Sequence, residues 1–145
     1  MTDTLISELS HGGLVEHLTI SSIIPVAVIL RTTFSRDGIE FFTPNSYSQQ
    51  LGYMNRPRGY SIQPHLHRPV LREIQHTNEI LFIKTGLVKV NFYSTNKIFV
   101  GARLLNAGDV ILLIQGGHGF EMIEDSEMIE VKQGPYANDM DKEKF

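Results

Sequence analysis

The chain has 145 residues, which is enough for one compact domain and too few for two well-packed ones. Hydrophobic residues make up 41% and charged residues 20%, a composition typical of globular proteins and not of disordered ones. Thirteen Lys and Arg against 16 Asp and Glu give a net charge of −3. With no basic excess to neutralise phosphates, we expect no nucleic-acid partner. The absence of cysteine excludes disulfides, thiolate metal sites and cysteine nucleophiles.

The N-terminal residues carry no cationic stretch followed by an apolar core, so no secretory signal is visible. The longest apolar stretch, residues 20–30, contains two serines and a proline and spans only eleven residues. A bilayer-spanning helix needs roughly 20. We therefore expect a buried strand here, no membrane partner and a cytoplasmic location.

In chain order, the first element has the only helical pattern. Within residues 5–18, Leu5, Leu9 and Val15 can share one helix face, although two glycines interrupt the pattern. The chain is divided into an N-terminal segment (1–24) with this short helical stretch, a β-barrel domain (25–136) and a charged, solvated tail (137–145).

From Pro25 onward the chain consists of short extended runs separated by turn signals, with no helical spacers. In the run that starts at Leu87, period-two alternation places Val88, Val90 and Phe92 on one face. Such a pattern predicts an all-β, antiparallel sandwich or barrel and excludes a βαβ topology. The ten expected runs are residues 26–34, 38–43, 49–55, 59–65, 79–84, 87–94, 97–105, 110–114, 119–124 and 127–132.

Four of the six histidines lie between positions 65 and 118. His65 and His67 are two residues apart, so on a strand both imidazoles project from one face and can reach one metal ion. Glu79 begins a later strand, and a glycine turn brings His118 to the start of another. Three imidazoles and one carboxylate suit a single divalent transition metal, namely Fe, Mn, Zn, Ni or Co. The predicted metal ligands are therefore His65, His67, Glu79 and His118.

These residues resemble the first motif of a small single-domain cupin. Five residues separate Gly59 from His65, and six residues separate Glu79 from Gly86. Eleven residues separate His67 from Glu79, more than in the family, which predicts an insertion over residues 68–78.

The insertion contains a rival carboxylate, Glu73, at a spacing closer to that of the family. We favour Glu79, because a strand and Gly86 follow it as they do in the motif.

The second cupin motif is degenerate. Gly108-Asp109-Val110 opens it, Gly116 keeps its glycine turn, and His118 arrives one residue early. Ile114 and Met122 replace the motif's proline and asparagine. The resemblance covers roughly residues 25–132 and implies an antiparallel double-stranded β-helix, the cupin or jelly-roll barrel.

Several polar side chains are candidates for contact with a substrate. The arginines around Pro57 could clamp an anion or lie in a solvated loop, and glutamines could bind a sugar or face solvent. The tyrosines could move a proton or pack as core aromatics, and His76 could have a loop role. The stretch 132–136 could close one mouth of the barrel or be a plain chain end. The predicted catalytic residues are His76, Tyr53 and Tyr60, and the predicted substrate-binding residues are Gln49, Arg56, Arg58 and Gln63.

The resemblance is closest to short cupins of sugar-nucleotide and surface-polysaccharide metabolism. It implies an isomerase or epimerase that acts on a small polar, carbonyl-bearing or sugar-like substrate, with the metal as Lewis acid. In a metal-free variant of the family, a histidine such as His65 or His67 is the base. Two alternatives stay open: a non-haem iron dioxygenase, and a module that binds a metal or sugar without catalysis.

Two aromatic pairs, Phe41-Phe42 and Phe92-Tyr93, must each direct one member away from the interior of a strand-built domain. An outward apolar face invites a partner, and small cupins commonly pair through their sheets. We therefore predict a homodimer.

Overall fold

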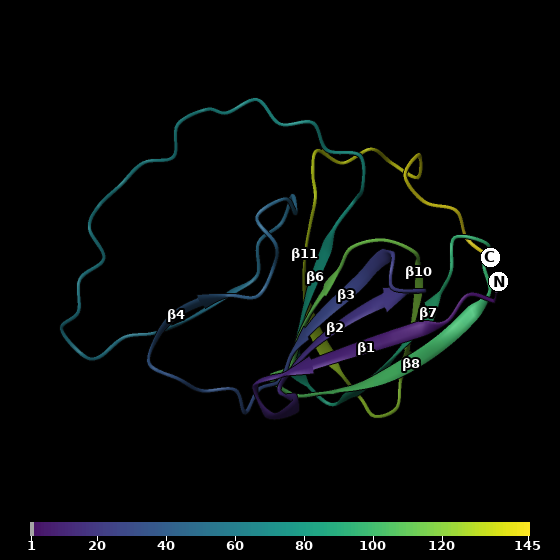
Figure 1. The fold of residues 1–145 in the computed structure, drawn as a ribbon, viewed down its shortest axis with the longest axis horizontal. Coiled ribbons are helices and arrows are strands. Elements are labelled where there is room, and N and C mark those ends of the chain that lie inside the picture. Colours follow the sequence, from purple (N-terminus) through teal and green to yellow (C-terminus); the bar gives the residue numbers. More distant parts are fainter. Residues whose placement is uncertain (1) are drawn as a thin grey trace. The chain divides into compact units, whose positions relative to one another are not determined.

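The computed structural model describes residues 2–145, whose regular secondary structure is almost entirely β-strand (Figure 1). All strand pairings are antiparallel, so the predicted all-β, antiparallel fold class is confirmed. The elements are β1 (Leu5–Ser10), the 3-10 turn η1 (His11–Gly13), β2 (Val15–Ile20), β3 (Ile24–Leu30), β4 (Gly38–Phe41), β5 (Gly52–Asn55), β6 (Glu79–Thr85), β7 (Leu87–Tyr93), β8 (Phe99–Asn106), β9 (Val110–Leu113), β10 (Gly117–Met122) and β11 (Glu127–Lys132).

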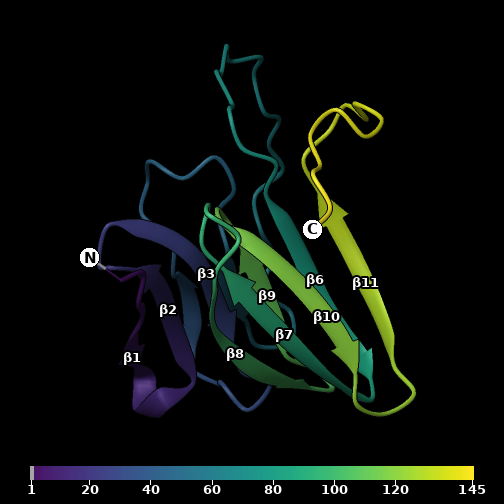
Figure 2. The same ribbon diagram turned by 90° about the vertical axis from the view of Figure 1, so that its right-hand side faces the viewer.

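The chain forms two compact units. The first unit comprises Met1–Phe34 and His76–Phe145, and the second comprises Ser35–Gln75. The first unit is built from a six-stranded sheet, in the order β1-β2-β3-β9-β6-β11, and a three-stranded sheet, β10-β7-β8 (Figure 2). Within residues 2–145, no helix has the length and hydrophobicity that a membrane crossing requires.

The core of the first unit follows from the alternation along its strands. Val88, Val90 and Phe92 of β7 are all fully buried, as their spacing predicts. Leu81 and Ile83 of β6 are buried in the same cluster, which draws its members from both sheets. The two sheets therefore pack against each other through their inward side chains, and each inward Leu, Ile or Phe removes apolar surface from water.

Two tight turns depend on glycine. Gly86 between β6 and β7 has φ +91°, and Gly108 before β9 has φ +89°. A Cβ on Gly108 would lie 2.2 Å from Thr32 Oγ1, so a side chain at this position is excluded by space as well as by conformation. These are two of the glycines that carry the family resemblance in the sequence.

One buried ion pair joins the two sheets. The Arg103 guanidinium of β8 donates from Nε to both carboxylate oxygens of Glu16 in β2, at 2.9 and 3.1 Å. The Ser7 hydroxyl donates to the same carboxylate. Burial alone would raise the pKa of Glu16, but the hydrogen bonds from Arg103 and Ser7 and the charge of Arg103 outweigh it and hold the pKa below its ordinary value.

The predicted N-terminal helix is wrong. Residues 5–18 instead form β1 and most of β2, which pair in register from Leu5 opposite Ile20 to Ser10 opposite Val15. The two glycines that interrupt the helical spacing lie in the turn between the strands, where Gly12 has φ +67° and Gly13 has φ +84°. Pairing along two edges of β2 satisfies more backbone groups than an isolated short helix would.

In the second unit, β4 and β5 form a hairpin with Ile39 opposite Met54. Gln50 holds the connecting loop, because its Nε2 donates to the carbonyl oxygens of Pro44 and Tyr47 at 2.9 and 2.8 Å. The predicted strand over residues 59–65 is wrong, since residues 56–75 contain no regular secondary structure and are exposed. No strand pairs with this segment, and Pro57 and Pro64 each lack an amide donor.

In each of the two aromatic pairs, one side chain is buried and its neighbour is more exposed, as the alternation predicts. Phe42 and Phe92 are buried, whereas Phe41 is 56% exposed and Tyr93 is half-buried. The homodimer inferred from them remains a prediction.

Candidate functional site

The clearest polar constellation in the first unit is a carboxylate–imidazole pair. Glu79 is the first residue of β6 and His118 is the second residue of β10, so one comes from each sheet. His118 Nε2 lies 3.1 Å from Glu79 Oε2. Glu79 points inward with Leu81, and His118 stands opposite Phe92 in the register with β7, on its inward face. The strand alternation of both sheets therefore brings the two side chains together.

The pair has a defined electrostatic character. The hydrogen bond from His118 is the largest influence on Glu79 and lowers the pKa of its carboxyl. Burial opposes this, while the positive charges of His118, Lys132 and Lys142 lower the pKa further. Glu79 is thus ionised at neutral pH and accepts a hydrogen bond from His118 Nε2. In the imidazole tautomer that carries its proton on Nε2, the lone pair lies on Nδ1.

The pair opens into a cavity of about 970 Å³ in the first unit. Glu79 is almost covered, with 10% of its side chain exposed, whereas 30% of the His118 side chain is exposed. The cavity therefore reaches the imidazole, while the carboxylate behind it is shielded. The lining residues are His76, Thr77, Glu79, Tyr93, Ile114, Gln115, Gly116, Gly117, His118, Gly119, Phe120, Glu130 and residues 141–145.

Of the four predicted metal ligands, the structure brings Glu79 and His118 together. His65 and His67 belong to the second unit, where their rings lie edge to face with centroids 5.2 Å apart. In the part of the chain that the structure describes, no group of three or more His, Asp or Glu side chains is arranged to hold a metal ion. The two converging donors do not fit a metal by themselves, so the four-ligand centre stays a prediction. Glu79, and not the rival Glu73, is the carboxylate that contacts His118.

His76 is the only one of the three predicted catalytic residues that lines the first-unit cavity. Tyr53 lies in β5. Tyr60 lies in the exposed segment 56–75, and the Arg56 guanidinium lies 4.6 Å from the centroid of the Tyr60 ring.

The predicted substrate-binding residues all belong to the second unit. Arg56, Arg58 and Gln63 are exposed, and the Gln63 carbonyl oxygen lies 2.9 Å from His65 Nδ1. Gln49 differs from them, because its Oε1 is buried and has no hydrogen-bond partner. Their substrate-binding role remains a prediction.

Sequence reasoning missed part of the cavity wall. Tyr93 was assigned only as an outward aromatic, and residues 141–145 were assigned to a solvated tail, yet all of them line the cavity. The stretch 132–136, which could have closed a mouth, ends in Tyr136, and Tyr136 is 76% exposed. The one feature of the sequence that could have indicated a packed segment here is Phe145, an aromatic residue within a charged run.

No known protein-family model matches this chain, and comparisons with curated proteins and with solved structures found no match. The functional interpretation therefore depends on the geometry of the site and on the sequence motifs.

Proposed function

We propose that this chain is an enzyme that moves a proton at a carbon beside the carbonyl group of a small polar, sugar-like molecule. This is chemistry of the isomerase or epimerase type. The observation that carries the proposal is the contact between His118 and the shielded carboxylate of Glu79 on the wall of a polar cavity. A carboxylate that orients a partly exposed imidazole is a recurrent arrangement in acid–base catalysis.

Each member of the pair has a distinct role in this chemistry. His118 Nδ1 takes the proton from the substrate carbon, and the ring becomes an imidazolium. The ionised Glu79 stabilises that cation and fixes the ring through Nε2. For an isomer, the imidazolium returns the proton to the former carbonyl carbon, the former carbonyl oxygen gains a proton, and the hydroxyl on the first carbon loses one. For an epimer, a second acid supplies a proton to the other face of the same carbon, and His76 on the same cavity is the candidate. His76 lines the same cavity and is the candidate donor to the carbonyl oxygen.

The cavity suits a ligand of this class. Its volume of about 970 Å³ is at the upper end of ordinary small-molecule sites, which run from about 300 to 1,000 Å³. The lining combines two histidines and several charged side chains with the aromatic rings of Tyr93 and Phe120. Sugars present hydroxyls for such polar groups and C–H faces for aromatic rings.

We further propose that the fold is of the cupin, or jelly-roll, type. Two antiparallel sheets around one core are compatible with it. The positive-φ glycines Gly86 and Gly108 occupy turn positions of the two motifs, and Glu79 and His118 come from one motif each.

A metal-dependent version of the same chemistry is the second candidate. It is favoured by the presence of three side chains of metal-ligand type, His76, Glu79 and His118, on one cavity. A divalent transition metal held there would act as a Lewis acid. The iron-dioxygenase alternative needs the same ligands and stays a prediction.

The test is deuterium exchange into sugars in D2O. Purified protein is incubated with a panel of aldoses, ketoses and their phosphates, and proton NMR follows the loss of signal at the carbon beside the carbonyl. The acid–base proposal predicts exchange into at least one sugar, with a rate that survives treatment with a chelator. Exchange that is abolished by the chelator and restored by one divalent ion would instead select the metal-dependent candidate. A panel without any exchange above buffer would contradict both.

A further inference from the structure

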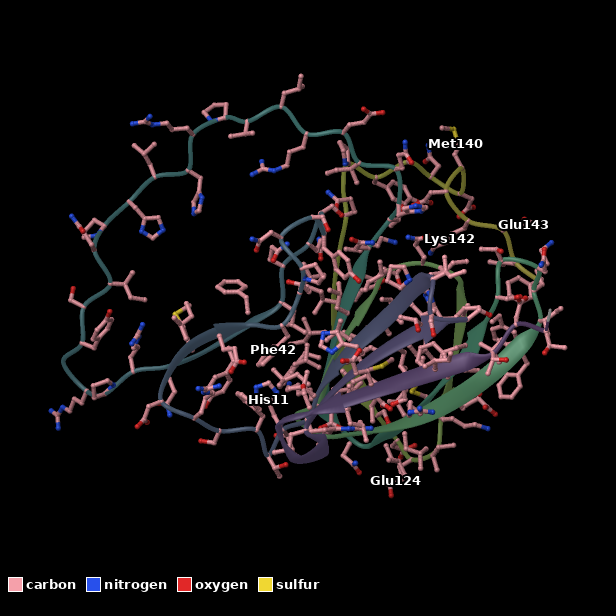
Figure 3. The ribbon with its side chains drawn as sticks, viewed as in Figure 1. His11, Phe42, Glu124, Met140, Lys142 and Glu143 are labelled. Carbon is pink, nitrogen blue, oxygen red and sulfur yellow. The ribbon has the colours of Figure 1, made fainter. Side chains whose placement is uncertain are left out.

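The charged segment at residues 139–145 lies along the first-unit cavity, although its residues stay exposed to solvent. Its residues 141–145 form part of the cavity wall, opposite the ends of β6 and β10. Figure 3 labels Met140, Lys142 and Glu143 on this segment. A run of seven residues with three acidic side chains and two lysines would ordinarily remain solvated. Specific contacts must therefore hold it in place.

Two polar contacts fix the segment. Asp141 Oδ2 accepts a hydrogen bond from Thr77 Oγ1 at 2.9 Å, just ahead of β6. Glu143 forms an ion pair with Lys97 in the turn between β7 and β8. Thr77 adjoins β6 of one sheet and Lys97 joins β7 to β8 of the other, so the segment is anchored beside both sheets.

An aromatic contact fixes its last residue. The Phe145 ring meets the Tyr93 ring edge to face, with centroids 5.2 Å apart and planes at 88°. The Phe145 ring also covers Gly117, so closely that a Cβ there would lie 2.9 Å from Phe145 Cζ. Gly117 immediately precedes His118 in β10, so Phe145 is anchored on the strand that carries His118, and both residues line the cavity.

All of these contacts are exposed, which makes them reversible. Phe145 keeps 64% of its surface in contact with solvent. In the Lys97–Glu143 pair, the two side chains are 45% and 74% exposed, and such a pair contributes little and is weakened by salt. No backbone hydrogen bond between strands holds the segment, because it contains no strand.

We propose that residues 139–145 are a releasable lid over the Glu79–His118 cavity, and that its release makes His118 more accessible to a ligand. The lid proposal rests on the proposed function in one respect, namely that the substrate binds in this cavity. In the closed state the lid narrows the access to the imidazole, 30% of whose side chain stays exposed, and in the open state it admits the substrate.

The test is chemical labelling of His118, which needs no substrate. Diethyl pyrocarbonate modifies accessible neutral imidazoles, and peptide mass spectrometry gives the rate at each histidine. The full chain is compared with a variant that ends at Asn138. We expect labelling of His118 to become several-fold faster in the shortened variant. His17 on β2 does not line the cavity and serves as the internal reference, with an unchanged rate that also reports an intact fold.

A pair of point variants provides a second readout. Lys97→Ala removes the Glu143 anchor, whereas Lys84→Ala removes a comparable exposed pair with Glu127 at the far end of β6. We expect faster His118 labelling in K97A and in high salt, and no change in K84A. Equal His118 rates in the full and shortened chains, or equal rates in K97A and K84A, would overturn the proposal. Because turnover does not enter this measurement, its failure would leave the acid–base proposal to the deuterium test.

Discussion

His118→Gln is expected to lower the rate of deuterium exchange by about 10²–10⁴, the contribution typical of one positioned general base. Glutamine is similar in size and its amide can still donate to Glu79, so the fold and the hydrogen bond to the carboxylate are kept. It has no nitrogen lone pair that can take a proton. The loss should appear in the chemical step, as a lower kcat at a nearly unchanged KM. The measurement is the rate of signal loss by NMR for the sugar with the fastest exchange in the unmodified protein.

Two further variants test whether the slower exchange is specific to the His118–Glu79 pair. Glu79→Gln should also slow the exchange, because a neutral amide cannot stabilise the imidazolium. His17→Gln, on a strand that does not line the cavity, should leave the rate unchanged. An exchange rate in H118Q that equals that of H17Q would remove His118 from the chemistry.

Asp109→Ala is expected to lower the free energy of unfolding by about 3–5 kcal/mol, the range for a buried charged group whose removal leaves its partners unpaired. Asp109 is 1% exposed. Its carboxylate accepts hydrogen bonds from the backbone amides of Thr32 and Asn106 at 2.9 and 2.7 Å. It also pairs with Arg31 at 2.9 Å, and Arg31 donates to the Leu104 carbonyl as well. Alanine would remove the carboxylate that accepts from the two backbone amides and that neutralises the Arg31 guanidinium.

Urea unfolding at pH 7 measures this loss. Asp109→Asn should cost less, because its carbonyl oxygen can keep one of the backbone hydrogen bonds. The matched control is Asp125→Ala, an exposed aspartate in the turn between β10 and β11, which should change stability by less than about 0.5 kcal/mol. If D109A and D125A unfold at the same urea concentration, the turn before β9 does not depend on this carboxylate.

The parts of the fold that sequence predicts correctly are those in which one local rule decides the structure. Along β7, alternation alone places Val88, Val90 and Phe92 in the core. The glycines Gly86 and Gly108 mark turns because their φ values are positive. Glu79 could be placed on the inward face of its strand for the same reason.

The errors arise where long-range partners decide the structure. Leu5, Leu9 and Val15 fit a helical spacing, but the pairing of β1 with β2 across Gly12 and Gly13 prevails. For residues 59–65 no neighbouring strand exists, and extended residues alone do not make a sheet.

The candidate site was predictable only in part for a similar reason. Glu79 and His118 come from separate motifs and meet as expected. The lid could not be predicted, because its residues form a charged run whose ordinary state is solvation. Its position depends on Thr77, Lys97 and Tyr93, which are 46 to 64 residues away in sequence from their partners in the lid, and no local pattern reports such contacts.

The most direct test of the central claim is a carbon-13 NMR titration of the Glu79 carboxyl, assigned with an E79Q spectrum. The hydrogen bond from His118 holds the pKa of Glu79 below its ordinary value of 4.5, so the group should stay ionised until the pH falls below that value. In His118→Ala the pKa should rise, because burial then acts against fewer compensating interactions, whereas in His76→Ala it should not change. A Glu79 pKa that is the same in the unmodified protein and in H118A would show that the two side chains do not act as a pair.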